Sequence, residues 1–218
     1  LVMIDPLVSW FSKARDLLNS RPNVHFELSI EEDDSGKSSF RRLDSILGGR
    51  KADIIISSST IHLIPERAIR DLASQFAGSL QEGGVFIWNS GDLESKFRPS
   101  DTALLHDPYR AIREILRDNE IRITRLSEMS SEEVLQHEGR LDRIFPGPYT
   151  MDVILDALSA VGFSSETHHE VIGFSNDDAE RFALVPRLSE IAAPLLHGEE
   201  RDEAIRGALK IALAEIAE

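Results

Sequence analysis

The sequence predicts an α/β protein with a doubly wound, mostly parallel sheet, and three neighbouring features support this class. Asp53-Ile54-Ile55-Ile56 is an apolar run, Ile69 to Leu80 repeats apolar residues at helical spacing, and Val85 to Trp88 follows a Gly-Gly pair. Short β-branched runs without alternation are typical of strands buried on both faces of a parallel sheet. A strand–helix–strand unit crosses over right-handed, and open sheets bind ligands at the carboxyl ends of their strands. We therefore expect a site in the loops 57–62 and 89–92.

The N-terminal segment predicts a second strand–helix–strand unit. Leu1 to Ile4 is apolar and stops at Asp5, and apolar residues at helical spacing predict a helix over 6–19. Val24 to Leu28 alternates apolar and polar residues, which favours a strand nearer a sheet edge.

The remaining elements follow from turn residues and periodicity. The polar run 31–39 is predicted to be a loop. Segment 97–149 is rich in arginine and interrupted by proline, and we expect it to be a helical lid that forms the substrate pocket. The spacing predicts a strand over 163–174 and helices over 40–47, 106–118, 130–143, 150–161, 176–185 and 201–217.

Composition restricts the function classes. The chain has 218 residues, is 41% hydrophobic and carries a formal net charge of −14, which suits one globular domain over residues 1–218 and disfavours nucleic acid as a partner. No apolar run approaches the ~20 residues of a membrane span, so no membrane partner is expected. The chain has no cysteine, which excludes disulfides and thiolate chemistry and fits a cytoplasmic location.

Three segments, VMIDPLVSWFSKA, DIIISSSTIHLIPE and LQEGGVFIW, occur in this order. Together they resemble the class I S-adenosylmethionine-dependent methyltransferases of the small-molecule group. The resemblance implies a Rossmann-like fold, S-adenosylmethionine as cofactor, S-adenosylhomocysteine as product and a small-molecule methyl acceptor. The family's first strand and glycine-rich loop are expected upstream of residue 1.

The resemblance also implies where the nucleoside binds. Asp5 would accept hydrogen bonds from both ribose hydroxyls, since a carboxylate has two acceptor oxygens, and Pro6 and Leu7 would flank the adenine. Ser29 and Ile30 occupy the loop where the family often reads the adenine amine. The alternatives are that Asp5 caps the helix after it and that Pro6 and Leu7 are ordinary helix-start residues.

Ser57, Ser58 and Ser59 would contact the amino-acid end of the cofactor, or else serve only as turn residues. His62 follows them and is the one candidate catalytic base, with a packed or capping histidine as the alternative.

Tyr109, Arg113 and Tyr149 are candidate substrate-binding residues. Arg113 shares a predicted helix face with Arg110 and Arg117, where the three could hold a carboxylate or phosphate, or merely form a solvated face paired with acids. Packing or surface roles are the alternative for the tyrosines. No metal-ligand spacing is present, so no metal is expected.

Two further functions remain open from the sequence. One is a non-catalytic scaffold that kept the fold without the cofactor. The other is an NAD(P)-linked oxidoreductase, which would need a Tyr-x-x-x-Lys or comparable catalytic set that the chain does not show.

Overall fold

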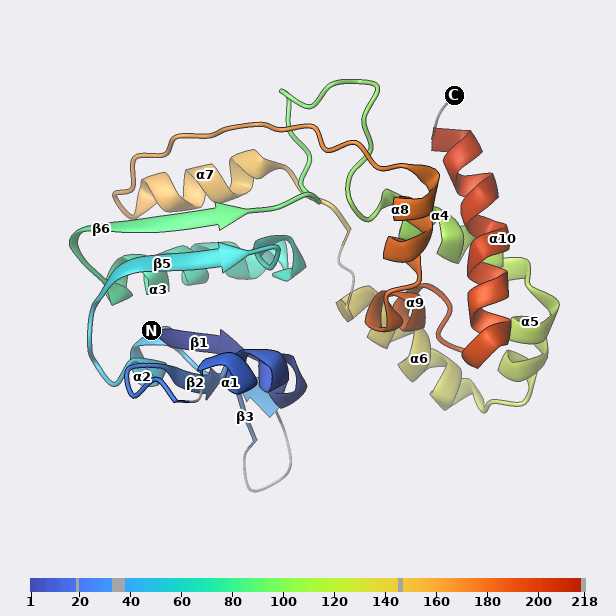
Figure 1. The fold of residues 1–218 in the computed structure, drawn as a ribbon, viewed down its shortest axis with the longest axis horizontal. Coiled ribbons are helices and arrows are strands. Elements are labelled where there is room, and N and C mark those ends of the chain that lie inside the picture. The colour runs from blue at the N-terminus through green and yellow to red at the C-terminus, as the bar shows by residue number, and fades with distance from the viewer. Residues whose placement is uncertain (19, 33–37, 145–146, 217–218) are drawn as a thin grey trace. The chain divides into compact units, whose positions relative to one another are not determined.

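The computed structural model describes four stretches of the chain and has an α/β architecture (Figure 1). The described residues are 1–18, 20–32, 38–144 and 147–216. Their strands form two-stranded sheets that pair β1 with β2, β3 with β4, and β5 with β6.

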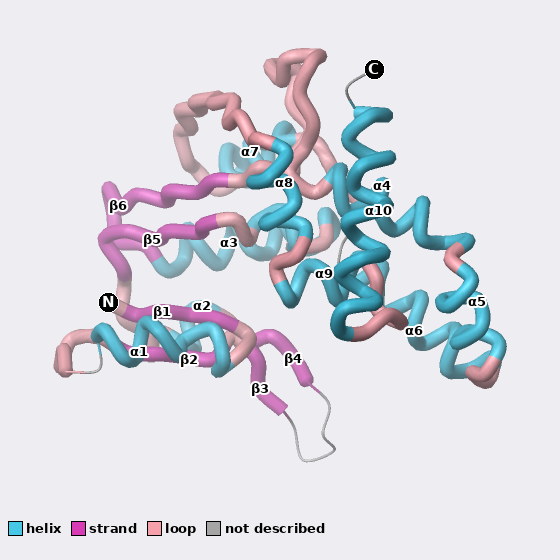
Figure 2. The backbone as a smooth tube through the Cα atoms, turned by 45° about the vertical axis from the view of Figure 1, so that its right-hand side comes forward, coloured by secondary structure: helices cyan, strands magenta, loops and turns pink. Residues whose placement is uncertain are grey.

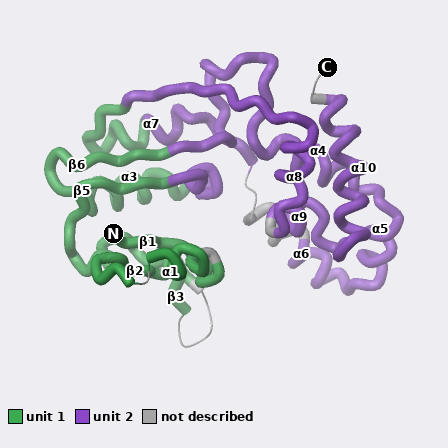
Figure 3. Tube along the Cα trace, viewed as in Figure 1, with its two compact units in different colours: residues 1–57, 67–88, 156–165 green, residues 58–66, 89–155, 166–218 purple. Residues whose placement is uncertain are grey.

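The chain divides into two compact units (Figure 3). Unit 1 contains the strands and α3, and unit 2 is mainly helical. Unit 1 comprises residues 1–57, 67–88 and 156–165, and unit 2 comprises 58–66, 89–155 and 166–218, of which 217–218 lie outside the described residues.

The first strand–helix–strand unit of unit 1 confirms both predicted strands. β1 (Val2–Asp5) pairs in parallel with β2 (His25–Leu28). The chain between them forms a 3-10 turn, η1 (Val8–Phe11), and then α1 (Ser12–Leu18), so the helix predicted over 6–19 is shorter than expected. Phe11 is buried and packs edge-on against Phe26, with ring centroids 5.3 Å apart, which joins η1 to β2.

A short hairpin replaces part of the predicted loop 31–39. β3 (Ile30–Glu32) runs antiparallel to β4 (Ser38–Phe40), whereas residues 33–37 lie outside the described residues. Because Phe40 pairs with Ile30, the predicted helix over 40–47 is reduced to α2 (Leu43–Ile46). The prediction of a loop was wrong for residues 31–32 and 38–39, because these residues pair between β3 and β4. The pairing supplies hydrogen-bond partners for their backbone groups.

The central strand–helix–strand unit is present as the sequence predicts. β5 (Ala52–Ser58) leads through the 3-10 turns η2 (Ile61–Leu63) and η3 (Glu66–Ala68) to α3 (Ile69–Ser79) and β6 (Leu80–Asn89). Figures 1 and 2 show β5 and β6 side by side, and the arrows in Figure 1 run in the same direction.

The sheet of β5 and β6 is covered on one face. Phe76 of α3 packs against Phe86 at a centroid distance of 4.2 Å. On the other face Ile54 is 55% exposed and Ile56 69% exposed, and Val85 is exposed beside them. The prediction that these strands are buried on both faces is therefore wrong for the described chain, because a run of isoleucines reveals hydrophobicity but not how many layers cover it.

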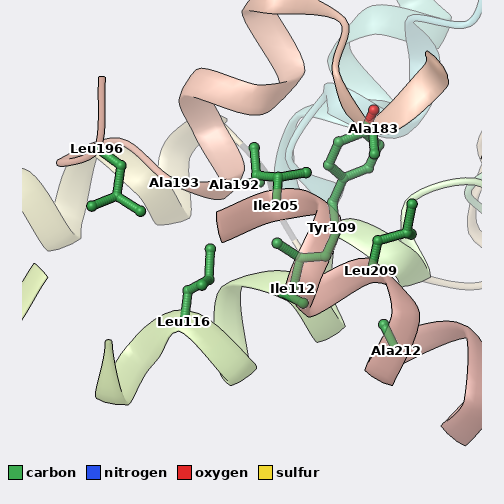
Figure 4. Close-up of a cluster of buried hydrophobic side chains, with 11 residues drawn as sticks. Tyr109, Ile112, Leu116, Ala183, Ala192, Ala193, Leu196, Ile205, Leu209 and Ala212 are labelled. Atoms are coloured by element: carbon green, nitrogen blue, oxygen red, sulfur yellow. The ribbon is translucent and has the colours of Figure 1, made fainter. Parts of the chain in front are cut away.

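Helices form unit 2, and their core joins the predicted lid segment to the C-terminal helices (Figure 4). Tyr109, Ile112 and Leu116 pack with Ile205 and Leu209. The segment 97–149 thus shares a core with the C-terminal helix. The helices are α4 (Asp107–Ile115), the 3-10 turn η4 (Leu116–Asp118), α5 (Glu120–Ser127), α6 (Ser131–Ile144), α8 (Asn176–Ala183), α9 (Pro186–Ala192) and α10 (Gly198–Ile216).

Local capping explains where two of these helices begin. Ser175 and Asp178 form a reciprocal capping box at α8, and Ser130 and Glu133 exchange the same pair of contacts at α6. Such boxes satisfy the amides that the first helical turn leaves unpaired.

The predicted strand over 163–174 is wrong. Residues 163–174 follow α7 (Met151–Ala160) and form no strand. The side chains of Val171 and Ile172 in this segment are exposed. A strand requires a partner with which it can exchange backbone hydrogen bonds, and side-chain alternation cannot supply that partner. Among the described residues, no helix is long and apolar enough to cross a membrane.

Candidate functional site

The predicted nucleoside-binding residues gather at the carboxyl ends of β1 and β2. The Leu7 amide donates to Asp5 Oδ1 at 2.8 Å, and the Ser29 amide donates to the Asp5 carbonyl oxygen at 3.0 Å. Pro6 lies between Asp5 and Leu7 in the chain. Ile30 directly follows Ser29 and is the first residue of β3. The parallel register places Asp5 opposite Leu28. It therefore brings Ser29, which is 24 positions after Asp5 in the sequence, next to Asp5.

The Asp5 carboxylate already has a local role. Its contact with the Leu7 amide closes a side-chain turn at the end of β1, although the N-cap position of η1 is Leu7 and has no side-chain cap. Oδ1 keeps a second lone pair, and the described contacts do not use Oδ2, so the half-buried group can still accept hydrogen bonds from a ligand.

The serine loop after β5 is closed against the end of β6. The Ser59 amide donates to Asn89 Oδ1 at 2.8 Å, and the hydroxyls of Ser58 and Ser59 each lie 3.4 Å from the same oxygen. Ser59 has φ of +50°, and the Thr60 hydroxyl donates to the Ser58 carbonyl oxygen. Ser57 is the half-buried penultimate residue of β5. The two loops suspected from the sequence therefore contact each other through Asn89.

A buried ionic network follows Asn89. Asp92, which is 2% exposed, accepts hydrogen bonds from both terminal nitrogens of the Arg110 guanidinium. It also accepts from the His106 amide at 3.1 Å and faces His106 Nδ1 at 3.1 Å. Burial opposes ionisation of Asp92, but the contacts with His106 and Arg110 outweigh it and hold its pKa well below the usual range.

His62 borders this network. Ser90 Oγ lies 2.9 Å from His62 Nδ1 and also accepts a hydrogen bond from the Asp92 amide at 3.1 Å. The His62 and His106 rings are 5.1 Å apart. Burial, and then the neighbouring charge of His106, lowers the pKa of His62 to about 4, and its side chain is 3% exposed. A neutral, enclosed imidazole bound to Ser90 fits the packing alternative better than a base open to substrate.

Ligand atoms of His62, Asp92 and His106 lie within 4.8 Å of one another, a spacing that could hold a metal ion. However, the Arg110 guanidinium already neutralises Asp92 at short range, and a divalent cation would have to displace it. We therefore assign the network to the stability of unit 2.

Both tyrosines of the chain are buried and held by backbone oxygens. The Tyr149 hydroxyl donates to the Ile61 carbonyl at 2.8 Å, and the Tyr109 hydroxyl donates to the Phe182 carbonyl. Burial raises the pKa of Tyr149, with a further contribution from Glu66, to about 12. These contacts fit the packing alternative. Arg113, by contrast, lines a cavity.

Sequence reasoning missed Ser90, His106 and Arg110 as parts of this network. Asp92 lay within a suspected loop, but its partner Arg110 lies in α4, and its partner His106 directly precedes that helix. The only available signal was an aspartate at the carboxyl end of a strand together with a later His-x-x-x-Arg spacing, which places both side chains on one helical turn.

No protein-family model matches the chain, and no curated protein is detectably similar to it.

Proposed function

We propose that the chain is a methyltransferase of doubly wound, Rossmann-like fold that transfers a methyl group from S-adenosylmethionine to a small-molecule acceptor. The observation that carries the proposal is the cluster of Asp5, Leu7 and Ser29 at the carboxyl ends of two parallel strands. Ligands of open α/β sheets bind at this edge. The order of three sequence segments that resemble the methyltransferase family supplies the choice of cofactor.

In this proposal Asp5 accepts hydrogen bonds from the ribose hydroxyls, while Pro6 and Leu7 flank the adenine. The family resemblance assigns Ser29 and Ile30 to the adenine, and Ser57 to Ser59 to the amino-acid end of the cofactor. A carboxylate fixed by its own turn loses little freedom when it binds a diol, which favours affinity.

Methyl transfer needs alignment more than acid–base chemistry. The cofactor sulfonium makes the methyl group electrophilic, and the protein has to hold nucleophile, methyl carbon and sulfur in line. His62 is the candidate base predicted from the sequence, but its contact with Ser90 and its low pKa suit a role in shaping the loop after β5. The proposal therefore assigns no general base.

The proposal is tested by titration calorimetry with S-adenosylhomocysteine on wild type and Asp5→Asn. Asparagine keeps the oxygen that accepts the Leu7 amide, so the turn is retained, but it loses the charge that binds two hydroxyls. We expect affinity to fall roughly 10- to 100-fold, which corresponds to the ~1.5–3 kcal/mol of a charged hydrogen-bond acceptor.

Asp16→Asn is the matched control, since it removes the same charge from an exposed position of α1 in the same unit. Absence of binding to wild type, or equal affinity in wild type and Asp5→Asn, would contradict the proposal.

A further inference from the structure

Unit 2 contains a cavity of about 240 Å³ beside the C-terminal end of α9. One wall is the chain from Ala192 to Leu196, and the other comes from α4, η4 and α5. The charged side chains that line it are Arg110, Arg113, Glu114, Arg117 and Arg122. Four guanidinium groups therefore face one cavity with a single carboxylate.

Two of the arginines are already neutralised. Arg110 binds Asp92 and Asp107, and Arg117 binds Glu114 at 2.6 Å. These pairs account for Glu114, the one acidic side chain among the residues that line the cavity.

Arg113 differs from its neighbours. It is half-buried, and the part of the chain that the structure describes gives it no carboxylate within ion-pair distance. The chain has 38 acidic residues against 24 lysines and arginines, so an unmatched arginine is not the outcome of a shortage of acids. A partly desolvated guanidinium on a cavity wall is a binding group for an anion.

A purely structural reading also exists. Arg113 lies in the last turn of α4, where a cation interacts favourably with the helix dipole. That interaction explains a positive charge at this position, but not why the guanidinium lines a cavity with no carboxylate beside it among the described residues. The two explanations of Arg113 differ in whether the cavity binds an anion from solution.

We propose that this cavity binds a small oxyanion, the phosphate or carboxylate group of a metabolite, through Arg113. The planar guanidinium offers two parallel N–H donors to two oxygens of the anion. The site lies wholly within unit 2, and the proposal does not depend on methyl transfer.

The test is an NMR titration of the ¹⁵N-labelled protein at constant ionic strength, with chloride replaced by inorganic phosphate in one arm and by succinate in the other. The backbone amides of Ala193 and Leu196 report on the cavity wall. We expect saturable shifts of these amides in at least one arm, and the arm that saturates at lower concentration identifies the anion class.

Arg113→Gln is expected to weaken binding at least tenfold, whereas Arg70→Gln, at an exposed position of α3, leaves it unchanged. Arg113→Lys keeps the charge at the helix end and preserves the fold if the glutamine variant does not fold. It should weaken binding at least threefold, because an ammonium cannot form the paired contacts.

Shifts that do not saturate in either arm would overturn the proposal. So would saturable shifts of the same affinity in wild type, Arg113→Gln and Arg113→Lys. Because no cofactor is added, these outcomes are independent of S-adenosylhomocysteine binding.

Discussion

The buried imidazole of His62 predicts a pH dependence of stability that can be measured directly. In the folded protein its pKa is lowered from 6.5 to about 4, first by burial and then by the charge of His106. The unfolded chain takes up this proton as the pH falls below 6.5, whereas the folded protein resists it until about pH 4. The unfolded state therefore binds more protons across this window, and stability falls with the pH.

The magnitude follows from the size of the shift. One pKa unit corresponds to 1.36 kcal/mol, so lowering the pH from above 6.5 to 4 should remove about 3 kcal/mol of the free energy of unfolding through this group. Asp92 contributes in a different window. Its folded pKa is depressed, so its contribution is full above the unfolded value near 4 and is lost only at lower pH.

The assay is urea unfolding followed by far-ultraviolet circular dichroism at several pH values between 7.5 and 4.5. We compare wild type with His62→Gln, whose side chain can still accept from Ser90 but does not titrate. The variant is expected to be less stable at pH 7.5 and to lose less stability on acidification. His197→Gln, at an exposed position before α10, controls for removal of a histidine from the surface.

Two results would refute this reasoning. One is a His62→Gln curve parallel to that of wild type between pH 7.5 and 4.5. The other is an NMR titration in which the His62 ring proton moves with a midpoint at or above 6.5.

Three further substitutions and one control substitution test the packing of unit 2 by urea unfolding. Asp92→Asn should cost about 3 kcal/mol, because it leaves the Arg110 guanidinium beside a neutral group, and a change under 1 kcal/mol would show that the network contributes little. Ile112→Ala should cost about 2–5 kcal/mol because Ile112 is 0% exposed, whereas Ile121→Ala, at a 42% exposed site, should stay within about 0.5 kcal/mol. Equal effects at the two positions would contradict the assigned core. Tyr149→Phe leaves a buried carbonyl oxygen without its donor and should cost about 1–3 kcal/mol, whereas wild-type stability would show that solvent replaces the hydroxyl.

The sequence predicted those elements whose signals are local. The strands of the central unit, the amphipathic α3 between them and the capped start of α8 were all readable, because helical spacing and capping act within a few residues. The loops after β5 and β6, which the sequence suggested as a site, contact each other through Ser59 and Asn89 in the structure.

The errors arose where the outcome depended on a distant partner. The segment 163–174 has the alternation of a strand but pairs with no described strand, and residues Ile30 and Phe40 pair across a stretch that reads as loop. The environment of His62, made by Ser90 and His106, could not be read from residues 28 and 44 positions away in the chain, and its role as a base stays a prediction.

The sequence by itself determined the α/β class, the acidic surface and the placement of Asp5 at the end of a strand, because composition and short-range periodicity encode all three. Tertiary structure alone decided that Asp92 is ionised and buried between Arg110 and His106, that the tyrosines donate to backbone carbonyls, and that Arg113 faces a cavity. Burial and charge pairing depend on which surfaces meet in space, and that information is not carried by neighbours in the chain.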